Sequence, residues 1–144
     1  MASHTPRQDW TRAEIRALYE QPLDQLIAAA LAVKSANWPD GTVQKSQLLS
    51  IKTGGCPEDC GYCSQSASFE TRVQAEKLMP LDEVVTAARQ ARAGGADRFC
   101  MGAAWRSLKD RDLPRVAEMI RAVKAEGLET CVTLGMLDEG QAEA

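Results

Sequence analysis

The amino-acid sequence predicts an α/β fold with parallel β-strands. Three short apolar segments alternate with two longer segments in which apolar residues recur with the period of an α-helix. Strands and helices that alternate in this way form parallel sheets with right-handed crossover connections. Two more segments with the helical period precede the first apolar segment, so we expect two helices followed by about three βα units.

The first predicted helix is marked by a capping box. Thr11 lies three residues before Glu14, a spacing at which each side chain can accept a hydrogen bond from the other residue's backbone N–H. We expect this helix to run to about Glu20. Residues 1–8 are polar, and we expect them to form a loose tail in which His4 is solvated rather than a ligand.

A second predicted helix starts at Pro22. Its apolar residues follow the helical period as far as Ala36, and the turn-forming residues 37–41 then end it. We therefore expect residues 9–41 to form an N-terminal helical segment and residues 42–144 to form the α/β domain.

The α/β domain is expected to contain three short strands, at residues 47–52, 98–102 and 129–134. Each segment is rich in apolar residues; Gly54 and Gly135 follow the first and the third, and Gly102 ends the second. Residues 64–79 are polar and show neither period, so we expect an irregular loop there.

Helices are expected between these strands. The first begins at Leu81 and is closed at Gly94, and the second is capped by Asp112 and ended by Gly127. From Asp138 onward the sequence reads as the first turn of another helix.

Two architectures suit this order of elements. A (β/α)8 barrel of the TIM type needs roughly 250 residues, whereas 144 residues supply only about three of its strands. The chain is therefore either a small open α/β sheet or the N-terminal part of a barrel. The unfinished helix at its end favours the barrel.

Composition argues against several classes of function. The formal net charge is −3, so no basic footprint for nucleic acid is present. No apolar run reaches the roughly 18 residues of a membrane span. No secretory signal precedes the five cysteines, so we expect a cytoplasmic protein with reduced thiols.

The chemistry of the sequence is concentrated in three closely spaced cysteines. Cys56, Cys60 and Cys63 are separated by three and then two residues, and Gly54 precedes them. Thiolates at close range suit a soft metal or an iron–sulfur cluster. A four-iron cluster with three protein ligands keeps one iron open, which is what a catalytic metal needs. Pro57 stiffens the chain between the first two ligands.

Other interpretations of these cysteines exist. Their spacing also places them on one face of a helix, but glycine and proline are poor residues for a helix interior. A zinc site would need a fourth ligand and more often pairs two short Cys-x-x-Cys units. Disulfides fit poorly with an odd number of cysteines.

The two remaining cysteines, Cys100 and Cys131, lie in the middle of neighbouring predicted strands. Strand residues alternate between the two faces of a sheet, so Phe99 and Met101 should face the helices and Cys100 the opposite side. Neighbouring strands lie about 4.8 Å apart, which would let one small cluster hold both sulfurs. Buried free cysteines are also common core residues, and the sequence alone favours that interpretation.

The cysteine motif, with an aromatic residue before its last cysteine, resembles the radical S-adenosylmethionine enzymes. Two longer stretches, LLSIKTGGCPEDC at 48–60 and RFCMGAAW at 98–105, resemble the biotin synthase family within that group. The resemblance runs from about Trp10 to the end of the chain. It implies that residues 42–144 are an incomplete radical S-adenosylmethionine barrel domain.

The resemblance implies two clusters. Cys56, Cys60 and Cys63 match the ligands of a [4Fe-4S] cluster whose open iron binds S-adenosyl-L-methionine. Cys100 and Cys131 match two of the four protein ligands of a [2Fe-2S] cluster inside the barrel, and the other two would come from later strands.

The resemblance also implies contacts to S-adenosylmethionine. Tyr62 matches an aromatic residue near its adenine, and the loop residues Ala103, Ala104 and Trp105 match a segment that approaches its methionine end. Ordinary loop packing is the alternative role for Tyr62 and Trp105. We assign no catalytic residue in this chain beyond the cluster ligands.

The activity implied is radical-dependent sulfur insertion that converts dethiobiotin to biotin, the last step of biotin synthesis. The implied partners are dethiobiotin, a flavodoxin or ferredoxin as electron donor, and a second copy in a homodimer. Three strands cannot close a barrel, so we expect this chain alone to be an inactive fragment. A small iron–sulfur electron carrier and a structural zinc module are the alternatives from other classes; each would need a fourth ligand near the first three.

Overall fold

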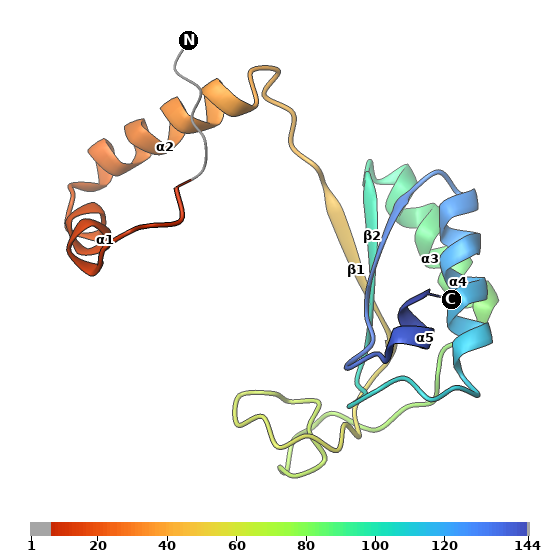
Figure 1. The fold of residues 1–144 in the computed structure, drawn as a ribbon. Helices are drawn as coiled ribbons and strands as arrows, with labels where there is room; N and C mark the ends of the chain where they lie inside the picture. The colour runs from red at the N-terminus through yellow and green to blue at the C-terminus, as the bar shows by residue number, and fades with distance from the viewer. Residues whose placement is uncertain (1–6, 144) are drawn as a thin grey trace. The chain divides into compact units, whose positions relative to one another are not determined.

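The computed structural model describes residues 7–143 and divides the chain into two compact units, with the division between Val43 and Gln44 (Figure 1). His4 and most of the predicted tail lie outside the described residues. Among the described residues, no helix has both the length and the apolar character that crossing a bilayer would require.

The first unit contains the two predicted helices, α1 (Arg12–Tyr19) and α2 (Leu23–Asn37). The predicted capping box is present. The Glu14 N–H donates to the Thr11 hydroxyl at 3.3 Å, and the Thr11 N–H donates to the Glu14 carboxylate at 2.8 Å. The second helix follows Pro22 directly, as expected.

The second unit is a three-stranded parallel sheet with helices between its strands (Figure 1). The sheet order follows the chain order, which confirms the predicted α/β alternation. The elements are β1 (Ser46–Lys52), α3 (Leu81–Ala93), β2 (Arg98–Ala103), α4 (Leu113–Ala125), β3 (Glu129–Thr133) and the short α5 (Glu139–Glu143).

The core lies between the sheet and one layer of helices, with α3 and α4 on the same side of the sheet (Figure 1). Phe99 and Met101 are each 1% exposed and face this layer, as the period of the strand predicts. The opposite face carries Cys100 and Cys131, which are half-buried, and Leu48, which is 68% exposed. The hydrophobic effect therefore holds the helices to one face and leaves the cysteine face outside the core.

The prediction that the Asp112 side chain caps the helix after it is wrong. Asp112 does precede α4, but its side chain makes no capping hydrogen bond. An N-cap residue needs an extended backbone, whereas the turn from Lys109, whose carbonyl accepts the Asp112 N–H at 2.8 Å, puts Asp112 in the helical region. Its carboxylate instead pairs with Arg111 at 3.5 Å.

The capping box makes α1 sensitive to acid. The pKa of Glu14 is lowered to about 2, first by the Thr11 N–H, then by the Thr11 hydroxyl and Arg7. A carboxyl with a depressed pKa stabilises the fold above its ordinary value of 4.5, and this stabilisation is lost as the pH falls toward 2. Thr11→Ala removes the hydroxyl but keeps the N–H, so the pKa should rise only part of the way, as measured by NMR titration of Glu14. Thr42→Ala is the control, and an unchanged pKa in Thr11→Ala would contradict the capping role.

Gly135, directly after the buried Leu134, should not tolerate a side chain. Its φ is +79°, and a Cβ there would meet the backbone oxygens of Arg106 and Trp105 at 2.5 and 2.6 Å. We expect Gly135→Ala to lower the free energy of unfolding by about 2 kcal/mol or more, measured by urea denaturation. Gly140→Ala is the matched control, because its nearest neighbour would lie at an ordinary 3.6 Å. Equal stability of the two variants would contradict this account.

Candidate metal centre

The cysteine loop leaves the C-terminal end of β1 through two glycines. Gly54 and Gly55 have φ values of +66° and +65°, which side-chain-bearing residues rarely adopt. A Cβ on Gly54 would lie 2.5 Å from the backbone oxygen of Gln74. Glycine is therefore needed here, because the returning part of the loop packs directly against its start.

Hydrogen bonds within the loop fix the backbone around the first cysteine. The Cys56 N–H donates to the Gln65 carbonyl at 2.9 Å, and the Ala67 N–H donates to the Cys56 carbonyl at 2.7 Å. Together these bonds form an isolated parallel bridge between Cys56 and Ser66. The Cys63 N–H donates to the Cys60 carbonyl at 2.9 Å, so the last two cysteines share one turn.

All three loop thiols are free. Cys56 and Cys63 are half-buried and Cys60 is exposed. Within residues 7–143, no three side chains of the His, Cys, Asp or Glu type are gathered into a group that could hold a metal ion. The loop thus carries three thiols on one short segment without directing their side chains to a common point.

Two of the three cysteines open onto a pocket of about 300 Å³ beside the loop. Residues from all three strands and from the segment after β2 complete it. Ala103, Ala104 and Trp105, predicted to contact a cofactor, all line this pocket, although Ala103 is the last residue of β2 and not part of the loop after it. Tyr62 does not line it and is 95% exposed. The lining residues are Leu48, Ser50, Cys56, Cys63, Gln65, Gly102, Ala103, Ala104, Trp105 and Thr133.

The structure adds polar residues that the sequence did not single out. The Lys52 ammonium donates to the carbonyl oxygens of Gly54 and Ala104, the latter at 3.1 Å. The Gln65 side-chain oxygen accepts the Gly54 N–H. Gln65 belongs to no motif. Lys52 lies within the stretch 48–60 that carries the family resemblance, but the sequence assigned it no role of its own.

Cys100 and Cys131 face each other across neighbouring strands. They are register partners in the β2–β3 ladder, which the sequence did not predict beyond placing both cysteines mid-strand on neighbouring strands. Burial raises the pKa of the Cys100 thiol, and its hydrogen bond with the Cys131 thiol raises it further, while Arg98 lowers it. Neither cysteine lines the pocket beside the loop.

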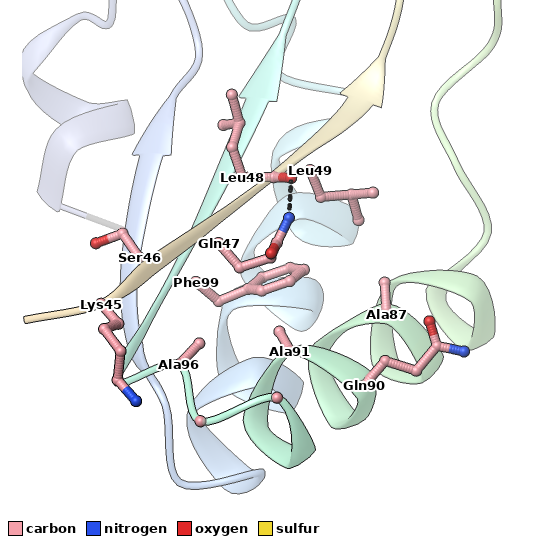
Figure 2. A pocket seen from close by; sticks show the side chains of 12 residues that line it. Lys45, Ser46, Gln47, Leu48, Leu49, Ala87, Gln90, Ala91, Ala96 and Phe99 are labelled. Carbon is pink, nitrogen blue, oxygen red and sulfur yellow. Dashed lines mark hydrogen bonds between the residues drawn. The ribbon is translucent and has the colours of Figure 1, made fainter.

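A different pocket, of about 400 Å³, lies between the start of β1 and the end of α3. Figure 2 shows the ring of Phe99 within it and the Gln47 amide donating to the Leu48 carbonyl at 3.3 Å. None of the predicted site residues line this pocket, which places it outside the candidate site.

The donor set fits an iron–sulfur group by its chemistry. Three free thiols occupy one loop, and two of them line a pocket whose other walls are mostly small or apolar. Soft thiolates of this kind select iron–sulfur clusters or zinc over hard cations. The residues present therefore suit such a group, although their side chains are not arranged around one in the described structure.

The chain was compared with protein-family models and with curated proteins. No family model matches the chain. The biotin synthase of Hyphomonas neptunium is 80% identical over 140 residues, which are 97% of this chain and 44% of that protein. The biotin synthases of Caulobacter vibrioides and Xanthomonas euvesicatoria are 61% and 60% identical, over 41% and 40% of their lengths. The chain spans less than half the length of these curated relatives. The chain is therefore a homologue of biotin synthases, to which it is similar over nearly its whole length.

Proposed function

We propose that this chain is the cluster-binding part of a biotin synthase, a radical S-adenosylmethionine enzyme that inserts sulfur into dethiobiotin to form biotin. The observation that carries the proposal is the pocket shared by Cys56, Cys63 and the segment Ala103, Ala104 and Trp105. Segments about 40 residues apart in sequence, each with its own resemblance to biotin synthases, meet at one place. The 80% identity to one biotin synthase supports the same assignment.

Cys56, Cys60 and Cys63 are proposed to hold a [4Fe-4S] cluster. When bound, such a cluster supplies the electron for reductive cleavage of S-adenosylmethionine. The chain's own contribution is to present three thiolates from a loop whose backbone is fixed by the Cys56–Ser66 bridge. Because the loop offers three ligands for four irons, one iron would remain open to bind S-adenosylmethionine.

The pocket beside the loop is proposed to take S-adenosylmethionine. Ala103 and Ala104 have small side chains that leave room next to Cys56 and Cys63, and Trp105 supplies an apolar wall that excludes water. Tyr62, two residues after Cys60 and exposed, is proposed to reach the adenine ring.

Cys100 and Cys131 are proposed as two ligands of a [2Fe-2S] cluster that donates the inserted sulfur. Their register pairing across β2 and β3 puts both thiols on the face of the sheet that lacks the α3–α4 core. The remaining ligands would come from outside this chain.

The proposed architecture is a (β/α)8 barrel in which residues 42–144 are the first part, preceded by the helical segment 9–41. Among the described strands, β1 and β3 each pair only with β2 and keep one edge free. Closing a parallel sheet through these edges would enclose the cysteine face as a lumen. The pocket between β1 and α3 in Figure 2 lies beside the β1 edge, where a further βα unit would pack.

The proposed partners follow from the same assignment. They are dethiobiotin as substrate, a flavodoxin or ferredoxin as electron donor and a second copy of the full-length chain in a homodimer. A cytoplasmic location is part of the same proposal, because the loop thiols must stay reduced to bind iron.

The first test concerns the loop ligands. Cys60→Ala should abolish assembly of the four-iron cluster in the full-length protein, measured as iron and sulfide content and visible absorbance after anaerobic reconstitution. Because Cys60 is exposed, the replacement should leave the circular dichroism spectrum unchanged. Ser64→Ala, an exposed position in the same loop, is the control and should load normally. A normal four-iron spectrum in Cys60→Ala would refute the assignment.

The second test separates the two clusters. Cys100→Ala or Cys131→Ala should remove the two-iron signal and biotin formation while the four-iron cluster still assembles, as Mössbauer spectroscopy can resolve. Thr130→Ala, next to Cys131 but on the other face of β3, should keep both clusters. Loss of both clusters together in the cysteine variants would show that these residues support the fold and are not ligands.

A further inference from the structure

Lys52 is the last residue of β1 and stands where the cysteine loop begins. Its side chain is half-buried, and its ammonium donates to the carbonyl oxygens of Gly54 and Ala104, the latter at 3.1 Å. Gly54 belongs to the cysteine loop and Ala104 to the segment after β2. One side chain therefore bonds to both segments that form the pocket.

The backbone of Lys52 also bonds to the segment after β2. The Ala104 N–H donates to the Lys52 carbonyl at 2.8 Å, so Lys52 and Ala104 are joined by hydrogen bonds in both directions. The β1–β2 ladder shifts register between Ser50 and Lys52, which brings Lys52 opposite Ala103. The shift is what lets the end of β1 reach the segment after β2.

A lysine suits this role for chemical reasons. An ammonium carries three N–H donors and can bond to two carbonyls that point from different segments. Among residues 7–143, no carboxylate lies within ion-pair distance of Lys52, so carbonyl dipoles are its partners. Hydrogen bonds from a charged donor are roughly twice as strong as those between neutral groups.

Lys52 does not itself line the pocket that contains Cys56 and Cys63. It lines a neighbouring pocket, together with Gly55 and Trp105. Its ammonium therefore acts on the shape of the candidate site through backbone carbonyls and not through contact with what the site holds.

We propose that Lys52 is a positioning residue that sets the separation between the cysteine loop and the segment Ala103, Ala104 and Trp105. This inference rests on the proposed function, in which one segment holds the four-iron cluster and the other binds S-adenosylmethionine. Loss of the ammonium leaves all three thiols in place but lets the two segments move apart. Cluster loading is then preserved while S-adenosylmethionine binding weakens.

The experiment compares Lys52→Met, Lys52→Arg and the control Lys45→Met in the full-length protein. Lys45 is exposed and lies just before the opposite end of β1, so it tests the loss of a lysine as such. Iron and sulfide content, the dissociation constant of S-adenosylmethionine, and its KM and kcat are measured after anaerobic reconstitution.

In Lys52→Met, iron content should match the wild type, and the dissociation constant and KM should rise about tenfold, equivalent to about 1.4 kcal/mol, with a smaller effect on kcat. Lys52→Arg should recover much of the affinity, because a guanidinium keeps the charge and several donors. Lys45→Met should behave as the wild type. Wild-type affinity in Lys52→Met, or no recovery in Lys52→Arg, would overturn the proposal.

Hydrogen exchange of the unloaded protein gives a readout independent of the cluster. Lys52→Met should speed exchange of the Gly54 and Ala104 N–H groups and leave exchange in α4 unchanged. Faster exchange throughout the sheet would mean a general structural role and would overturn the positioning role. If the wild type takes up no cluster or S-adenosylmethionine, the proposed function fails, and hydrogen exchange still decides whether Lys52 joins the two segments.

Discussion

The parallel register of the three strands determines which candidate functional segments meet. Because all strands run in one direction, the segments that follow β1 and β2 both leave the sheet at the C-terminal end of the strands. The β1–β2 register, with its shift near Lys52, brings the cysteine loop next to Ala104. The β2–β3 register places Cys100 directly opposite Cys131. A slip of β2 by one residue would turn Cys100 toward the helices and bring Phe99 out of the core.

The two groups of thiols depend on the fold to different degrees. Cys56, Cys60 and Cys63 belong to one loop. Its backbone is held by hydrogen bonds within the loop and by glycines whose need arises from contacts within the loop itself. Cys100 and Cys131 meet only because two strands and the helix between them pack correctly. Loss of the α3–α4 core would separate the second pair, whereas the loop would keep its three thiols on one segment.

The sequence was sufficient to predict the elements because their signals are local. Glycines, the capping box at Thr11 and the periods of apolar residues each lie within one element, and the structure has the same order. Strand alternation alone predicted that Cys100 and Cys131 lie on the face of the sheet away from the helices. The roles of Lys52 and Gln65 could not be predicted, since both depend on carbonyl or N–H partners that only the folded loop brings within reach. The cap at Asp112 failed because a preceding turn, invisible in composition, set its backbone angles.

The backbone of the cysteine loop is constrained by its own local geometry. Metal binding is costly when it must also order the chain that carries its ligands. Here the backbone is already constrained by the positive φ angles at Gly54 and Gly55 and by the Cys56–Ser66 bridge, while the thiols remain free and Cys60 is exposed. The glycine angles and the bridge thus restrict the backbone of the loop in the structure itself, before any group is bound. A backbone restricted in this way has less conformational entropy left to lose when a ligand orders it, so the glycines and the bridge lower the cost of binding at this loop.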